Sequence, residues 1–173
     1  PFAVEELVAQ DVESLHIAKG EREKNDIPVI ALDKPIFSSL LNQWQVNGYS
    51  VIGSYADSQL LPLGDNDIVC YIFGADCWVH TKSSAIKLNS SVLPFYIDSW
   101  VNEEGLNDQN VNAMVYVNVD YTPDHQLIIA SLQQNGAIVI NQAVTQLTPI
   151  EFFAEGYFHS SNTTINLCQG EFQ

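Results

Sequence analysis

The chain has 173 residues, with 21 acidic and 6 basic side chains and a formal charge of −15. Hydrophobic residues make up 46% and charged residues only 16%, which excludes a disordered acidic tail and predicts one domain over residues 1–173 with its own core. The charge argues against a nucleic-acid partner and against an anionic membrane, because proteins bind both through clustered Lys and Arg.

The first part of the chain is predicted to be helical. Apolar residues recur at mostly helical spacing over residues 3–18, and Gly20 follows as a stop, so we expect an N-terminal helix within residues 1–20. Asp33-Lys34-Pro35 opens a second helix, which ends at Asn47-Gly48. The apolar stripe of this second helix consists of Ile36, Phe37, Leu40, Leu41 and Trp44.

After Gly48 the pattern changes from helix to strand. Residues 49–55 and 68–73 are short, rich in β-branched and aromatic residues, and bounded by turn residues, so both are predicted strands. The segment 77–88 is ambiguous, with a helix over residues 79–88 as one interpretation. The apolar piece 92–97 is short and lies between irregular segments.

The clearest pattern covers residues 113–144 and predicts an antiparallel meander. Apolar and polar residues alternate over 113–120, as they do in a half-buried strand. A Pro-Asp-His turn leads to a second strand at 126–132. Asn135-Gly136 is the signal of a two-residue hairpin before a third strand at 137–144.

The C-terminal part begins with a short helix. Thr148 is the predicted N-cap and Glu151 completes a capping box, with Pro149 at the first helical position. Residues 160–173 form a polar tail. The predicted class is therefore α+β: N-terminal helices, a mostly antiparallel β-sheet with the meander at 113–144, and a short C-terminal helix.

Cofactor and metal motifs are missing from the sequence. No glycine-rich phosphate loop occurs, so no nucleotide cofactor is expected. The cysteines and histidines lack the two close ligand pairs of structural zinc, so no metal is expected. The three cysteines are an odd number, which fits three reduced thiols or one disulfide and one free thiol.

One set of residues suggests an enzyme. Cys77 with Trp78 after it, then His125 at the start of a predicted strand, then Asn141 one hairpin later is similar to the chain order of papain-like cysteine enzymes. That resemblance implies a hydrolase or transferase with Cys77, His125 and Asn141 as its catalytic residues. The sequence has no upstream Gln at a suitable distance to stabilise an oxyanion, and this departure favours a structural Cys77 with no catalytic residues.

Aromatic residues are dense near the C-terminus. One short helix cannot bury all of its rings, so we expect Phe153, Tyr157 and Phe158 to contact a partner, together with Glu151 and Glu155. From Leu88 to Gln173 the chain has no Lys or Arg, and this acidic surface serves solubility or steers a basic protein partner.

No motif identifies a reaction. The favoured interpretation is a non-enzymatic acidic protein-binding module, like an inhibitor, an immunity protein or an adaptor, with no membrane partner. The alternatives are a viral or phage structural or assembly subunit and the cysteine-dependent enzyme. The chain has no visible signal peptide and no apolar run of about 18 residues, so we expect a cytoplasmic protein, with a removed leader left open.

Overall fold

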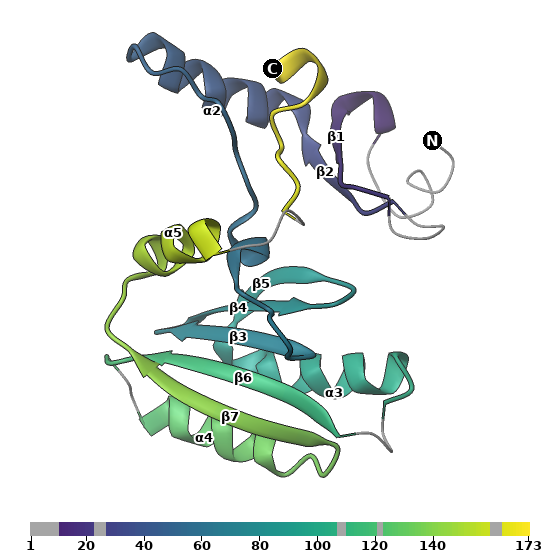
Figure 1. The fold of residues 1–173 in the computed structure, drawn as a ribbon, viewed down its shortest axis with the longest axis vertical. Helices are drawn as coiled ribbons and strands as arrows, with labels where there is room; N and C mark the ends of the chain where they lie inside the picture. The colour runs from purple at the N-terminus through teal and green to yellow at the C-terminus, as the bar shows by residue number, and fades with distance from the viewer. Residues whose placement is uncertain (1–10, 23–26, 107–109, 121–122, 160–163) are drawn as a thin grey trace. The chain divides into compact units, whose positions relative to one another are not determined.

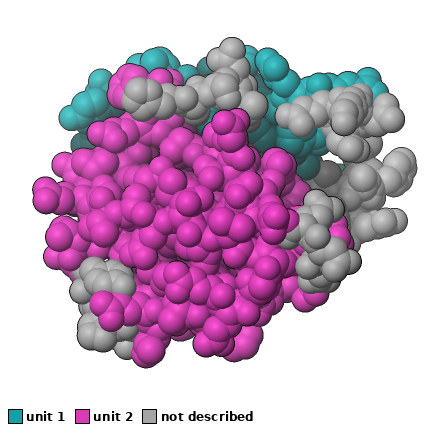
Figure 2. Space-filling view, turned by 60° about the horizontal axis from the view of Figure 1, so that its bottom comes forward, with its two compact units in different colours: residues 1–56, 161–173 teal, residues 57–160 magenta. Residues whose placement is uncertain are grey.

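The computed structural model describes residues 11–22, 27–106, 110–120, 123–159 and 164–173. The chain divides into two compact units, coloured differently in Figure 2. Unit 1 contains residues 1–56 and 161–173, and unit 2 contains residues 57–160. The expectation of a single domain over the whole chain stays a prediction. Within the described residues, no helix has both the length and the apolar character needed to cross a bilayer.

Unit 1 joins the two ends of the sequence. Strand β1 (Leu15–Lys19) pairs antiparallel with β2 (Val29–Asp33), and helix α2 (Lys34–Val46) follows directly (Figure 1). The core of this unit consists of Ala18, Phe37, Leu41, Ile165, Leu167 and Cys168. The amide of Leu167 donates to the carbonyl of Ser54 at 2.7 Å, so the C-terminal segment is held by hydrogen bonds as well as by packing.

The predicted N-terminal helix is wrong within residues 11–20, the part of it that the structure describes. Residues 1–10 lie outside the described residues, and Leu15–Lys19 form a strand in which His16 and Ala18 are buried. The physical reason is the pairing with Val29–Asp33, a partner distant in sequence that helical spacing does not reveal. The second predicted helix is confirmed as α2, whose N-cap Asp33 accepts the amide of Ile36 at 2.9 Å.

Unit 2 is built on a five-stranded mixed sheet of order β5-β4-β3-β6-β7 (Figure 1). Its β3-β4 and β4-β5 pairs are antiparallel, whereas β3-β6 and β6-β7 are parallel. The strands are β3 (Ile68–Phe73), β4 (Asp76–Thr81), β5 (Ala85–Asn89), β6 (Val111–Asn118) and β7 (Ile138–Thr145).

Both faces of this sheet are covered, because alternate residues of a strand point to opposite sides. On one face, Cys70 and Val115 pack with residues of helices α3 (Leu93–Glu103) and α4 (Pro123–Gln133). On the other face, Tyr71 packs with Phe152 and Phe153 of helix α5 (Pro149–His159). The sheet and its three helices therefore make a layered α+β unit (Figure 1).

The predicted antiparallel meander at 113–144 is wrong in its middle. Residues 126–132 belong to α4, and Asn135-Gly136 leads from α4 into β7 instead of forming a hairpin. Because β6 and β7 are parallel, the chain must cross over between them, and a helix is the usual crossover. Because α4 is this crossover helix and packs on the sheet, its residues His125, Ile129 and Leu132, which lie at helical spacing, are buried. The α+β class is confirmed, but the sheet is mixed and helices alternate with its later strands.

Other local predictions have mixed outcomes. The strand at 68–73 is confirmed as β3 and the capped C-terminal helix as α5. The segment 77–88 forms strands β4 and β5, so the helical interpretation of 79–88 is wrong. Residues 93–97 belong to the start of α3, Val92 ends the 3-10 helix before it, and residues 49–55 have no regular secondary structure.

Candidate interaction surface

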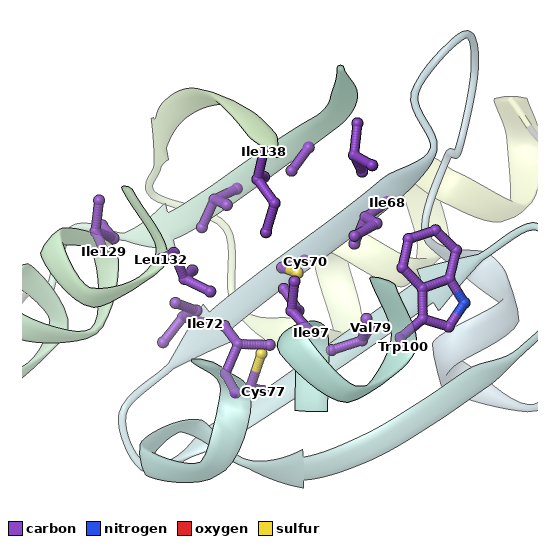
Figure 3. Close-up of a cluster of buried hydrophobic side chains, with 14 of the residues drawn as sticks. Ile68, Cys70, Ile72, Cys77, Val79, Ile97, Trp100, Ile129, Leu132 and Ile138 are labelled. Atoms are coloured by element: carbon purple, nitrogen blue, oxygen red, sulfur yellow. The ribbon is translucent and has the colours of Figure 1, made fainter. Parts of the chain in front are cut away.

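The cysteine proposed as a nucleophile lies inside the core of unit 2. Cys77 has no exposed surface and packs with Cys70 and Ile97 in the cluster of Figure 3. Its thiol donates to the carbonyl of Trp78 at 3.7 Å. Burial, with smaller effects from Cys70 and Asp76, raises the pKa of Cys77 well above its ordinary value. A buried thiol of raised pKa is a poor nucleophile.

The other two residues of the papain-like order lie on different elements. His125 is on α4, where its Nε2 donates to the carbonyl of Gly74 at 2.7 Å. Asn141 is an exposed residue of β7, opposite Met114 of β6. His125 therefore does not begin a strand, and no hairpin joins it to Asn141. All three cysteines are free, and no group of three or more His, Cys, Asp or Glu in the described part of the chain is placed to hold a metal ion.

Helix α5 carries the residues predicted to bind a partner. Phe153 is buried, with its ring 5.2 Å from that of Trp78. Tyr157 and Phe158 are 44% and 81% exposed and their rings meet edge to face at 5.6 Å. The structure thus assigns Phe153 to the core and leaves the next two aromatic residues of the prediction at the surface.

The start of α5 is fixed by its predicted capping box. Glu151 accepts from both the amide and the hydroxyl of Thr148, at 2.8 and 2.6 Å. Both bonds lower the pKa of Glu151, and the bond from the Thr148 hydroxyl has the larger effect. Glu151 and Glu155 are exposed beside the apolar residues Ile150 and Ala154. We call the exposed residues Ile150, Glu151, Ala154, Glu155, Tyr157 and Phe158 the α5 surface.

A second exposed apolar region, which the sequence did not indicate, lies between α3 and α4. It contains a pocket of about 690 Å³ lined by residues that include Pro94, Phe95, Leu127 and Ile128. Phe95 and Leu127 are 75% and 69% exposed. No sequence signal marked it, because Leu127 lies in the segment predicted as a strand.

Helix α2 has a third exposed apolar region. Its predicted apolar stripe divides into two: Phe37 and Leu41 are buried, whereas Ile36, Leu40 and Trp44 are 70%, 47% and 50% exposed. We call these last three residues the α2 stripe. The sequence shows the width of the apolar arc, but only the structure shows that unit 1 buries two of its five residues.

Comparison with known proteins gives the family. A family model described as type II secretion system (T2SS), protein L, matches residues 1–173. The structure is similar to that of the cytoplasmic domain of EpsL, an inner membrane component of the type II secretion system of Vibrio cholerae, with a TM-score of 0.72 and 16% identity. The match covers 95% of this chain and 66% of that structure, so the chain spans slightly under two thirds of it.

A second similar structure is a protein of Bacteroides thetaiotaomicron with an actin-like ATPase fold and unknown function. Its TM-score is 0.47 at 13% identity, with 92% of this chain and 65% of that chain covered. No curated protein sequence matches the chain.

The family match corrects the expected function and partners. An acidic inhibitor, immunity protein or adaptor, a viral or phage subunit and a papain-like enzyme are all wrong for a component of a secretion system. The expectation of a basic protein partner and no membrane is also wrong, since EpsL is an inner membrane component. The physical reason is that net charge reports solubility and long-range steering, which many unrelated proteins share. The chain belongs to the type II secretion system protein L family.

Proposed function

We propose that this chain is a cytoplasm-facing part of an inner-membrane secretion protein and that its α5 surface holds another component of the secretion system. The location is supported by the similarity to the cytoplasmic domain of EpsL. The docking role is supported by one observation, the exposed ring pair of Tyr157 and Phe158 on a helix whose opposite face is fixed in the core.

The geometry of α5 suits a preformed anchor. Phe152 stacks on Tyr71 with centroids 4.4 Å apart and an interplanar angle of 1°, so the buried face holds the rotation of the helix. Large aromatic side chains on a rigid helix lose little conformational entropy when a partner covers them. Ile150, 78% exposed, extends the apolar area toward the start of the helix.

The test places a photo-crosslinking amino acid at residue 158 of the full-length protein in its native host. We expect a crosslink to a second component of the same secretion system, identified by mass spectrometry. Residue 144 is the matched control, because Val144 is 66% exposed on β7 of the same unit and belongs to none of the exposed apolar regions described above. Equal crosslinking from both positions, or none from residue 158 in secreting cells, would refute the α5 surface as the docking site.

A secretion assay complements the crosslink. Phe158→Ala removes the more exposed ring and should reduce the amount of protein secreted into the medium, whereas Val144→Ala should leave it unchanged. The abundance of the variant protein in the membrane fraction separates a docking defect from degradation. Normal secretion by Phe158→Ala at normal abundance would count against the proposal.

A further inference from the structure

Strand β7, Ile138–Thr145, forms an edge of the sheet in unit 2 (Figure 1). Natural proteins protect sheet edges from other chains by short strands, charged side chains, proline or bulges. The opposite edge strand, β5, follows this rule, because it has five residues and carries Lys87. Strand β7 has eight residues, contains no charged residue and no proline, and pairs with β6 without a bulge. It is therefore open to pairing with a further strand.

The pairing with β6 shows which backbone groups of β7 point outward. The carbonyls of Ala137 and Thr145 accept amides that belong to the β6 side, so the odd-numbered residues turn their backbone groups toward β6. The even-numbered residues turn theirs away from it. Within the described part of the chain, no hydrogen bond occupies the outward N–H and C=O groups of Ile140, Gln142 and Val144.

Side chains of β7 add apolar surface to this edge. Val139 and Val144 are 46% and 66% exposed. They lie on opposite faces of the sheet, because successive residues of a strand alternate between the two faces. A strand placed beside β7 would therefore cover apolar surface on both faces.

We infer that β7 pairs antiparallel with β7 of a second copy of this chain, with Gln142 on the twofold axis. The sheets of the two copies then continue into one sheet. The backbone of β7 supplies the hydrogen bonds, and the exposed valines supply apolar burial.

This register gives a partner to every outward group named above. Paired residues must lie on the same face of the joined sheet, so Gln142 meets its own copy and Ile140 meets Val144. Each of these pairs exchanges two hydrogen bonds. An axis moved by one residue would place Val144 opposite Ile138, whose amide already donates to the carbonyl of Asn135 at 3.1 Å. This complete match of β7 with itself favours a second copy over an unrelated strand.

Charge also favours contact between copies at β7 over the other exposed regions of unit 2. Two copies of a chain of formal charge −15 repel each other, so they meet most readily where no carboxylates face one another. Helix α5 exposes Glu151 and Glu155, and the pocket between α3 and α4 includes Asp98. In the proposed pairing, every side chain of β7 that meets the other copy is uncharged.

The contact is separate from the docking surface proposed on α5. A photo-crosslinker at residue 144 would join two copies of this chain, and mass spectrometry distinguishes that product from the second component expected at residue 158. Val144→Ala keeps the backbone groups that make the pairing. Residue 144 therefore remains a control for α5, and either proposal can fail without the other.

Sedimentation velocity of the chain tests the pairing. The contact of one strand pair is small, so we expect a reversible dimer with a dissociation constant on the order of 10–100 µM in solution. The dimer should become tighter as salt screens the repulsion between the two copies. A chain that stays monomeric in high salt at a concentration on the order of 1 mM would overturn the inference.

Substitutions at residue 142 separate the backbone contribution from the side chain. Gln142→Pro removes an N–H that points away from β6, so the fold should persist in urea denaturation while the dimer is lost. Gln142→Ala keeps that N–H and should dimerise like the wild type. Unchanged dimerisation of Gln142→Pro would overturn the inference.

A charge variant gives a test that needs no change of the backbone. Gln142→Glu places two carboxylates opposite each other and should weaken the dimer at least about fivefold. Gln133→Glu makes the same change at an exposed position of α4 and should leave the dimer as it is. Equal weakening by both variants would show that net charge, and not β7, governs the association, and would overturn the inference.

Disulfide trapping tests the register. The three native cysteines are free and buried, so a cysteine introduced on β7 is the accessible thiol. In the proposed pairing the two α-carbons of residue 142 lie about 5.5 Å apart, within the range that a disulfide spans, whereas residue 141 lies about 7–8 Å from its copy. With a mild copper oxidant, Gln142→Cys should form a covalent dimer faster than Asn141→Cys. Faster trapping at residue 141, or no trapping at either residue, would overturn the proposed pairing.

Discussion

Gly156 of α5 lies so close to the carbonyl group of Leu60 that a β-carbon at residue 156 would overlap the carbonyl oxygen. Leu60 ends a short 3-10 helix, Asp57–Leu60, which packs on α5 within unit 2. Only glycine allows this approach of two backbones. The contact brings α5 close to the 3-10 helix and acts together with the buried aromatic face of α5 in holding the rotation of the helix.

Gly156→Ala should destabilise unit 2. Alanine favours a helix over glycine by about 1 kcal/mol, but the overlap with the Leu60 backbone cannot be relieved by a side-chain rotation, and overpacking costs typically about 1–3 kcal/mol. We expect a net loss in the free energy of unfolding, measured by urea denaturation.

Gly136→Ala is the matched control for this prediction. A β-carbon at residue 136 would meet no atom within 4 Å, and Gly136 is not among the glycines with positive φ. The control should stay within about 0.5 kcal/mol of the wild type. A Gly156→Ala chain as stable as this control would show that the Leu60 contact is looser than the structure indicates.

Local signals in the sequence predict the elements whose boundaries are set locally. Helix α2 has its N-cap at Asp33, and α5 has its capping box at Thr148 and Glu151. These hydrogen bonds join residues three apart, so the residue types alone reveal them. Strand β3 is likewise marked by its dense β-branched and aromatic residues.

Elements whose state depends on distant pairing could not be predicted this way. Leu15–Lys19 has a helical pattern, but pairing with β2 makes it a strand. Residues 126–132 contain an apolar run centred on two adjacent isoleucines, but the parallel pairing of β6 and β7 requires a crossover connection, and α4 provides it. Asn135-Gly136 is a hairpin signal only when the flanking strands are antiparallel neighbours.

Only part of the candidate site can be predicted from the sequence, because the burial of its aromatic rings also depends on residues distant in the chain. The density of aromatic residues near the C-terminus showed that some rings must stay exposed. Which rings do so depends on packing between elements: Phe153 packs against Trp78 and Tyr71, whereas Tyr157 and Phe158 stay exposed. The sequence also marks the apolar arc of α2, but such an arc does not show how much of it the fold covers.

Cys77 should be chemically inert in the folded chain. Burial raises the pKa of its thiol, and the side chain has no exposed surface. Alkylation should therefore be limited by opening of the fold and should be much slower than in urea. Ser131→Cys, at an exposed position of α4, is the control that should react quickly. Comparable rates at residues 77 and 131 in the folded chain would contradict a buried thiol.

Asp67 should make stability depend on acid pH. Its carboxylate accepts hydrogen bonds from the Lys82 ammonium at 2.5 Å and from the Asn112 amide at 3.0 Å. These bonds lower the pKa of Asp67 below its ordinary value of 3.8, and the bond from Lys82 has the larger effect. Because the pKa of Asp67 is lower in the folded state, its ionised form stabilises the fold when the pH is above the ordinary pKa. This contribution disappears as the pH falls through the lowered pKa of the folded state.

The corresponding variant is Asp67→Asn, which removes the ion pair with Lys82. The loss at pH 7 should be roughly 0.5–1 kcal/mol, because the Lys82 end of the pair is exposed and screened by solvent. The difference in the free energy of unfolding between wild type and variant should become smaller below about pH 3.8. Asp65→Asn changes an exposed neighbour and is the control. A gap of equal size at pH 7 and pH 3 would exclude ionisation of Asp67 as its origin.

Tyr71 and Asn118 should stabilise the start of α5 jointly, because both donate to the carbonyl oxygen of Leu147. The Tyr71 hydroxyl and the Asn118 amide are each 2.7 Å from that oxygen. Burial raises the pKa of Tyr71, so its hydroxyl keeps the proton that it donates. Leu147 connects β7 to α5, and a carbonyl oxygen with two lone pairs can accept both bonds.

A double-mutant cycle tests this shared acceptor. Tyr71→Phe keeps the ring that stacks on Phe152 and should cost only about 0.5–1.5 kcal/mol, because Asn118 still satisfies the oxygen. Asn118→Ala leaves the Tyr71 bond in place but also loses the acceptor of the Asp120 amide. The bond from the Asp120 amide is lost whether residue 71 is Tyr or Phe, so the double-mutant cycle cancels its contribution. The double variant should be less stable than the sum of the single changes by about 1 kcal/mol or more, because the Leu147 oxygen then loses both donors. Strictly additive losses in urea denaturation would mean that water replaces the missing donors and that the two side chains do not act together.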